Sequence, residues 1–138
     1  LVSKRWLSTI LFKNAAKPSV IKKILYQAYP TQNNVDDTLI NILLKPSLRN
    51  DAAEAFRGFI NIFDDHLAPN LIKDIEIPIN LIWGESDPWE PINEAKSWFS
   101  KYDSIKSLKV INNAGHCPHD ECPDKVNKEL ITLIQQAT

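Results

Sequence analysis

The sequence predicts an α/β fold, with helices through the first half of the chain and a parallel sheet in the second half. Apolar residues recur at helical spacing through about the first 70 positions, which carry no strand pattern. Two runs with strand character follow, at 75–83 and 107–111, and a helical pattern lies between them. A strand–helix–strand order of this kind predicts that the two strands run parallel.

The first half is predicted to form a series of helices joined by short polar or proline-bearing links. Pro18 suits the first turn of one helix, and Pro30 closes it. Asp36 and Asp37 suit the N-terminus of the next helix, which we expect Pro46 to end. The apolar stripes are Trp6, Leu7, Ile10 and Leu11; Val20, Ile21, Ile24, Leu25 and Ala28; Leu39, Ile40, Leu43 and Leu44; and Ala52, Ala53, Phe56, Phe59, Ile60 and Phe63.

The second half is predicted to alternate strands and helices. The run at 75–83 becomes continuously apolar as it approaches Gly84, which is typical of a strand covered on both faces. We expect Pro91 to open the following helix and the final helix to begin near Pro123, after the strand at 107–111.

Composition excludes several classes of protein. The chain has 138 residues, 43% of them hydrophobic and 24% charged, which excludes a disordered or collagen-like chain. A net charge of −1 gives no electrostatic basis for binding nucleic acid or an anionic membrane. Two cysteines are too few for a disulfide scaffold, and no apolar run reaches the roughly 20 residues of a transmembrane segment.

Other features lead us to expect part of a longer protein. The chain begins with Leu1, contains no Met and has 3 Gly. Two parallel strands do not form a stable α/β sheet by themselves, because both faces and both edges need cover. We therefore expect further strands N-terminal to Leu1.

Ionisable residues follow both predicted strands, at the sheet edge where open α/β folds place their catalytic groups. Asp87 comes just after the first strand, and His116 just after the second. Neighbouring strands lie about 4.8 Å apart, so we expect the two side chains to meet. A carboxylate beside an imidazole fixes its tautomer and stabilises the imidazolium that forms when the histidine takes a proton. A helix cap or turn is the commoner role of a lone Asp, but two such residues at successive strand ends favour an acid–base pair.

These segments carry a resemblance to a known family. Gly84-x-x-Asp87-x-x-x-Pro91, followed by Gly115-His116 and then Glu121-x-Pro123, resembles the C-terminal part of the α/β-hydrolases. The segments Trp83-Gly-Glu-Ser-Asp-Pro-Trp89 and Gly115-His-Cys-Pro-His-Asp-Glu121 are similar to those of the pheophytinase-like hydrolases of plants and cyanobacteria. The resemblance covers about residues 70–138. It implies a C-terminal fragment of an α/β-hydrolase fold, with a helical cap (lid) over 1–70 and the C-terminal part of the core over 71–138.

The resemblance implies a serine hydrolase that acts on a lipophilic small-molecule ester, the phytyl ester of a chlorophyll derivative being the subgroup's substrate. Asp87 would be the acid of a Ser–Asp–His triad and His116 its base, with no metal and no organic cofactor. The chain has no G-x-S-x-G, because its glycines, Gly58, Gly84 and Gly115, are too far apart. We therefore expect the nucleophile to lie upstream and this chain alone to be inactive.

Aromatic residues near the pair allow two interpretations each. Trp89 follows the predicted acid, so it either lines the substrate pocket or packs against the next helix. The aromatic stripe of Phe56, Phe59 and Phe63 is typical of core packing, and a lid surface over a lipophilic substrate is its alternative.

A metal site is an alternative interpretation of the segment after the second strand, but its spacing fits poorly. His116-x-x-His119 and Cys117-x₄-Cys122 match neither of the usual zinc spacings. Asp120 or Glu121 instead suits the backbone donors where the last helix begins. We expect both cysteines to be reduced thiols in an intracellular protein. The expected location is the cytoplasm, or the plastid if the source is a photosynthetic eukaryote.

Other functions stay open at this point. The parent protein of this fold could bind a ligand or a partner without turnover, although such a protein has no need of an acid–base pair. Dehalogenase or epoxide hydrolase chemistry, which uses an Asp nucleophile, is a further alternative. A small helical or metal-binding domain complete at this length is disfavoured by the two-stranded sheet. The sequence predicts no oligomeric state.

Overall fold

The computed structural model of the chain describes residues 5–61 and 67–137. It divides the chain into two compact units, one made of residues 1–25 and 35–67 and the other of 26–34 and 68–138. The pattern change near residue 70 lies close to this division. Residues 26–34, however, belong to the second unit although they lie within the helical first half of the sequence.

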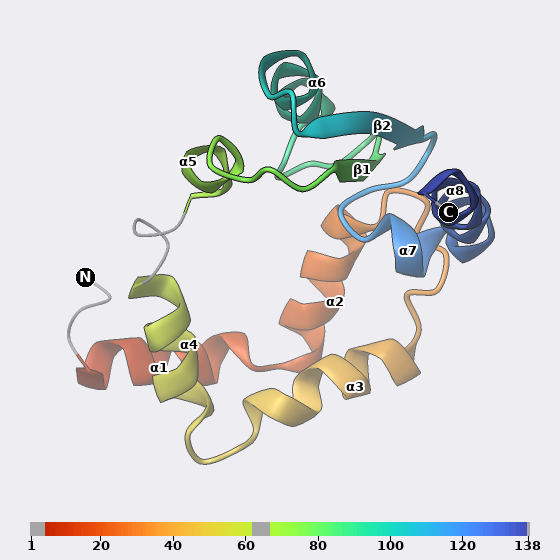
Figure 1. Cartoon of the computed structure of the whole chain (residues 1–138). Coiled ribbons are helices and arrows are strands. Elements are labelled where there is room, and N and C mark those ends of the chain that lie inside the picture. The colour runs from red at the N-terminus through yellow and green to blue at the C-terminus, as the bar shows by residue number, and fades with distance from the viewer. Residues whose placement is uncertain (1–4, 62–66, 138) are drawn as a thin grey trace. The chain divides into compact units, whose positions relative to one another are not determined.

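The first unit is helical (Figure 1). It contains α1 (Arg5–Ala15), most of α2 (Pro18–Ala28), α3 (Asp37–Ser47) and α4 (Ala52–Asn61). Helix α4 packs against α1 and α3, and the rings of Phe12 and Phe56 lie 5.2 Å apart. Phe56 and Phe59 are still 45% and 56% exposed, so packing does not bury this aromatic stripe. Phe63 lies outside the described residues.

The boundaries of α3 are partly as predicted. The Asp36 side chain caps the helix by accepting a hydrogen bond of 2.8 Å from the Leu39 N–H. The expected end at Pro46 is wrong, because the helix continues to Ser47. Proline lacks the N–H that would donate to the carbonyl four residues earlier, so Pro46 costs the helix one hydrogen bond, yet Ser47 is still helical. The Leu48 N–H then closes the helix on the carbonyls of residues 45 and 46.

The second unit is built on a two-stranded parallel sheet. Strand β1 (Ile79–Gly84) pairs with β2 (Ile105–Ile111), and α6 (Ile92–Lys101) connects them. The one-turn helix α7 (Pro118–Glu121) and the longer α8 (Pro123–Ala137) follow, while α5 (Ala68–Ile72) precedes the sheet. This arrangement confirms the predicted α/β class.

Two helices cover opposite faces of the sheet. Successive residues of a strand point to opposite faces. Ile82 packs with Ile111 and with Val126 of α8, whereas the ring of Trp83 meets Trp98 of α6 edge-on at 5.8 Å. Figure 1 shows α6 on one side of the strands and α8 on the other. The prediction of a strand covered on both faces is therefore confirmed, although Ile82 and Trp83 are only partly buried.

The strand limits differ from the predicted ones for identifiable reasons. Strand β1 begins only after Pro78, because proline has no N–H to donate to the ladder. Strand β2 begins two residues early, at the buried Ile105, which pairs with Ile79. The short helix α7 was not predicted, since a single turn offers no repeat of the apolar pattern.

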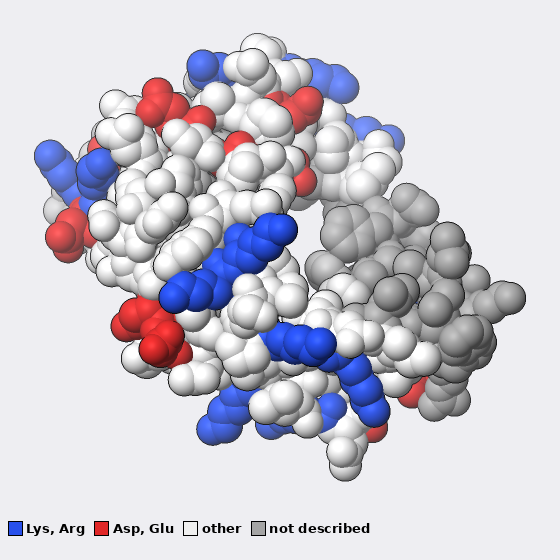
Figure 2. All heavy atoms as spheres, turned by 180° about the vertical axis from the view of Figure 1, so that it is seen from behind, with Lys and Arg blue, Asp and Glu red and all other residues white. Residues whose placement is uncertain are grey.

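Charged side chains of both signs lie on the surface of the molecule. Acidic and basic side chains both occur over the face seen in Figure 2, in keeping with 16 basic and 17 acidic residues. Within the described residues, no helix combines the length and the apolar character needed to cross a bilayer.

Candidate active site

The loops that follow β1 and β2 lie against each other. The Glu85 N–H donates to the carbonyl of Ile111 at 3.0 Å, and the Ser86 N–H donates to that of Ala114 at 2.9 Å. Gly84 allows this approach, because a Cβ at that position would overlap the carbonyl oxygens of Ala114 and Gly115. The glycine that ends β1 therefore brings the segment after each strand within reach of the other.

Asp87 is fixed by the backbone of its own loop. Its Oδ1 accepts hydrogen bonds from the N–H groups of Trp89 at 2.9 Å and Glu90 at 3.0 Å, and its side chain is 5% exposed. Burial alone raises the pKa of this carboxyl, but the hydrogen bonds from Glu90, Trp89 and His116 outweigh it and hold the pKa below its ordinary value. The carboxylate is therefore charged at neutral pH and held in one orientation.

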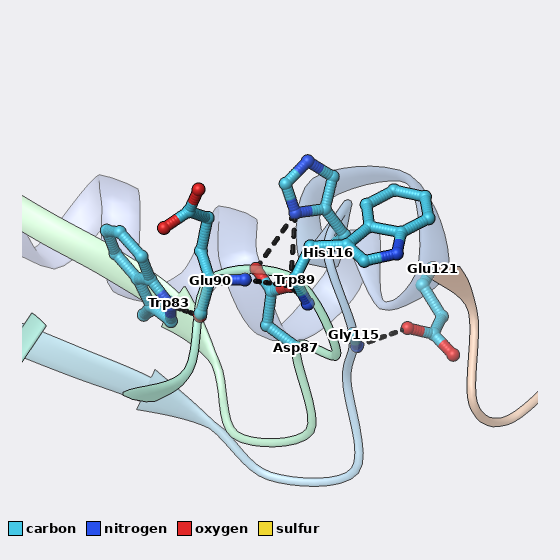
Figure 3. Close-up of polar contacts among 7 residues, drawn as sticks. All are labelled: Trp83, Asp87, Trp89, Glu90, Gly115, His116 and Glu121. Atoms are coloured by element: carbon cyan, nitrogen blue, oxygen red, sulfur yellow. Dashed lines mark hydrogen bonds and ion pairs between the residues drawn. The ribbon is translucent and has the colours of Figure 1, made fainter. Parts of the chain in front are cut away.

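His116 meets this carboxylate as the sequence predicts. Its Nδ1 lies 2.9 Å from Oδ2 and 3.1 Å from Oδ1 of Asp87. A charged carboxylate only accepts hydrogen bonds, so Nδ1 carries a proton, and the neutral form of the imidazole then has its free lone pair on Nε2. Figure 3 shows Nε2 on the side of the ring turned away from Asp87, and the side chain is 37% exposed. The imidazole thus presents a basic nitrogen to its surroundings.

The segment that carries His116 is held by residues from much earlier in the chain. The His116 N–H donates to the carbonyl of Ala28 at 2.9 Å. Glu121, 4% exposed, accepts from the Gly115 N–H at 2.6 Å and from the Thr31 N–H at 2.9 Å and hydroxyl at 2.5 Å. Nothing in the local pattern around Ala28 or Thr31 indicated this role, because the partners are about 90 positions away.

The two carboxylates of α7 do not serve the start of the last helix, so that expectation is wrong. The Asp120 carboxylate accepts from the Tyr29 hydroxyl at 2.5 Å, and Glu121 binds Thr31 and Gly115. The N–H groups of Lys125 and Val126 in the first turn of α8 instead donate to the carbonyl of Cys122. A backbone carbonyl satisfies those donors, which leaves both carboxylates free for the distant segment.

The Tyr29 hydroxyl and the Cys117 thiol are both protonated at neutral pH. Burial, and then the hydrogen bond to Asp120, raise the pKa of Tyr29 far above its ordinary value. Burial also raises the pKa of Cys117. Cys117 and Cys122 are both free thiols. The part of the chain that the structure describes contains no group of three or more His, Cys, Asp or Glu residues able to hold a metal ion.

A cavity of about 220 Å³ opens beside the Asp87–His116 pair. The residues that line it are Ile82, Trp83, Gly84, Asp87, Glu90, His116, Pro118 and His119. One wall is fixed by the Trp83 indole N–H, which donates to the carbonyl of Glu90 at 2.8 Å. Trp89 is 45% exposed and meets the His116 ring edge-on at 4.8 Å, as Figure 3 shows. It therefore stands beside the pair with a free surface.

The comparisons with known proteins agree with these motifs. No family model matches the chain. The chain is 27% identical over 126 residues to a chloroplastic pheophytinase of Arabidopsis thaliana, a match that covers 88% of this chain and 26% of that protein. It is 25% identical over 135 residues to an uncharacterized hydrolase, YugF, of Bacillus subtilis, with 98% of this chain and 46% of that protein covered.

The chain thus spans between about a quarter and a half of the length of these curated relatives. Its α/β architecture is the one expected of the C-terminal part of an α/β-hydrolase. The resemblance indicated by the strand-end motifs is therefore confirmed as distant homology to hydrolases, a pheophytinase among them.

Proposed function

We propose that this chain supplies the acid and the base of a Ser–Asp–His triad to an ester hydrolase. Asp87 is the acid and His116 the general base. The observation that carries the proposal is the 2.9 Å contact between the two side chains at the carboxyl ends of neighbouring parallel strands. Distant homology to hydrolases supports the reaction class.

The proposed chemistry follows from the contact between Asp87 and Nδ1 of His116. The Nε2 of His116 takes the proton of a nucleophilic hydroxyl as that oxygen attacks the ester carbonyl, and Asp87 stabilises the resulting imidazolium. The same nitrogen then returns the proton to the departing alcohol, which leaves an acyl-enzyme that water hydrolyses. The 138 residues contain no G-x-S-x-G, so the serine and the oxyanion donors come from outside them, and the chain alone is expected to be inactive.

The proposed substrate is a lipophilic ester, with the phytyl ester of a chlorophyll derivative as the first candidate. The name of the Arabidopsis relative supports this choice, as does the exposed indole of Trp89 beside the His116 ring, which we propose binds substrate. Residues 1–70 are proposed to form a cap (lid), in which the exposed Phe56 and Phe59 suit an apolar substrate. Residues 71–138 are proposed to belong to the catalytic core. The proposed location is the cytoplasm, or the plastid in a photosynthetic eukaryote.

Hydrolysis of p-nitrophenyl esters and of pheophytin by the native protein that carries this chain tests the proposal. His116→Ala is expected to lower kcat by several orders of magnitude, and Asp87→Asn by a somewhat smaller factor. Asp124→Asn is the matched control, because this exposed carboxylate lies at the start of α8 and outside the cavity. Turnover that survives His116→Ala at the control rate would show that His116 is not the base.

A further inference from the structure

The loop that carries His116 is clamped by residues that take no part in the proposed proton transfer. We propose that Glu121 is a positioning residue, which holds His116 against Asp87 by tying Gly115 to Thr31. This inference rests on the proposed function, because it concerns how the base of that triad is placed. Neither the motif spacing nor the homology to hydrolases assigns this role to Glu121 and Thr31.

Glu121 uses both of its carboxyl oxygens in this tie. Oε1 accepts from the N–H and the hydroxyl of Thr31, and Oε2 accepts from the N–H of Gly115. A buried carboxyl group is costly unless donors compensate for the water it has lost, and three donors do so here. Gly115 directly precedes His116, so this contact fixes the peptide that leads into the base.

A second set of contacts holds the same loop from the same distant segment. The carbonyl of Ala28 accepts from the His116 N–H at 2.9 Å. The hydroxyl of Tyr29 and the Nδ2 of Asn34 bind the carboxylate and the carbonyl of Asp120, at 2.5 Å and 2.8 Å. Residues 28–34 therefore contact the loop at His116, before α7, and again at Asp120 and Glu121, within α7.

Two residues of the segment 28–34 have an unusual backbone conformation. Gln32 and Asn34 have φ angles of 56° and 65°, in the left-handed region that few residues other than glycine adopt. Such a conformation persists when surrounding contacts determine it, and the Thr31 and Asn34 contacts lie on either side of Gln32. The contacts with the His116 loop therefore also fix the backbone conformation of residues 28–34.

Displacement of the loop would break the acid–base contact. The Nδ1–Oδ2 distance of 2.9 Å between His116 and Asp87 is near the usual hydrogen-bond length, and a shift of about 1 Å would take it beyond bonding range. Asp87 is fixed by its own loop, so the contact depends on where the second loop places His116. Glu121 acts on the contact through Gly115 and touches neither side chain of the pair.

The test reads the tautomer of His116 by long-range ¹H–¹⁵N NMR of the native protein that carries this chain, with the imidazole in its neutral form. The unmodified protein is expected to show the Nδ1–H form. Thr31→Val removes one hydroxyl at nearly constant volume, and in this variant we expect His116 to lose its preference for the Nδ1–H form. Thr31→Ser keeps the hydroxyl, so we expect His116 to keep that preference. Glu121→Gln, which removes the charge, is expected to act like Thr31→Val.

The thermal midpoint of each variant separates positioning from a merely structural role. If Thr31→Val and Glu121→Gln lower the midpoint but leave His116 in the Nδ1–H form, the positioning role is overturned. If Glu121→Gln fails to fold, the Thr31→Val and Thr31→Ser pair decides, because it changes a single hydroxyl group.

Asp87→Asn distinguishes failure of this inference from failure of the proposed function. Loss of the Nδ1–H preference in Asp87→Asn, but not in Thr31→Val or Glu121→Gln, overturns only the positioning role. An unchanged tautomer in Asp87→Asn overturns the acid–base pair, and with it the positioning role that rests on the pair.

Discussion

The two loops that carry Asp87 and His116 are held in different ways. Asp87 receives its backbone hydrogen bonds from Trp89 and Glu90, two and three positions further along the same loop. The loop of His116 is instead held by residues 28–34, about 90 positions away in the sequence. One half of the pair is therefore positioned locally, and the other depends on contacts that form only when the second unit is complete.

This difference shows where the pair is vulnerable. A short turn that satisfies its own backbone groups keeps its shape with little help from the rest of the molecule. The loop of His116 also has local contacts, such as the one from Gly115 to Glu121, but its contacts with residues 28–34 are lost when either side of them changes. Substitutions that touch the distant contacts should therefore disturb the site most.

The largest effect is expected where the backbone itself must move. In Gly115→Ala, the added Cβ would overlap the carbonyl of Ala28 and the ring of Pro30, neither of which can turn away. We expect the free energy of unfolding to fall by about 3 kcal/mol, at the upper end of the usual cost of overpacking. Urea unfolding followed by tryptophan fluorescence measures it. An unchanged urea midpoint would show that residues 28–34 do not pack closely against the loop at Gly115.

Removal of the Glu121 carboxyl group is expected to rank next. In Glu121→Ala, the half-buried donors of Thr31 and the buried N–H of Gly115 lose their acceptor, at a cost of about 1–3 kcal/mol. The same urea titration measures this loss, with Asp124→Asn as the control for removing an acidic side chain nearby. Equal urea midpoints for Glu121→Ala and the control would contradict the claim that the contact between Glu121 and Thr31 stabilises the His116 loop.

Asp87→Asn is expected to have a smaller effect on stability, and one that depends on pH. The amide keeps an oxygen for Trp89 and Glu90 but loses the charge, which we expect to cost about 1 kcal/mol at neutral pH. The folded pKa of Asp87 lies below its ordinary value, so its contribution is complete above about pH 4 and is lost as the pH falls through the folded pKa. The difference between Asp87→Asn and the unmodified chain should shrink below that pH. A difference that grows in acid would contradict the lowered pKa.

The smallest effect, of opposite sign, is expected in the first unit. Gly58 lies inside α4, and a Cβ there would meet nothing within 4 Å. Gly58→Ala should stabilise the chain by about 0.5–1 kcal/mol, because alanine is the better helix former. Gly58→Ala is the matched control for Gly115→Ala. If Gly58→Ala also destabilised the chain, the effect of Gly115→Ala could not be assigned to the overlap with Ala28 and Pro30.

The predictability of the site follows the same division between local and distant contacts. The turn around Asp87 could be predicted because Gly84, Asp87 and Pro91 lie within one short segment, and the meeting with His116 followed from the parallel strands. The part played by Tyr29 and Thr31 could not be predicted, because a hydroxyl bound to a carboxylate 90 positions away leaves no periodic pattern.

The fold shows a similar limit. Apolar periodicity predicted the α/β class and the helix that follows Pro91. It did not predict the start of β1, which follows Pro78, or the end of α3, which lies one residue beyond Pro46. Proline acts on single hydrogen bonds, and whether the chain tolerates the loss depends on its place in the element.

The tautomer of His116 in the unmodified protein is the sharpest test of the Asp87–His116 pair. Long-range ¹H–¹⁵N NMR, with the imidazole in its neutral form, is predicted to show the proton on Nδ1, bound to Asp87. The signal should be lost in Asp87→Asn and kept in Asp124→Asn. A proton on Nε2 in the unmodified protein, or an Nδ1–H signal that survives Asp87→Asn, would contradict the acid–base pair.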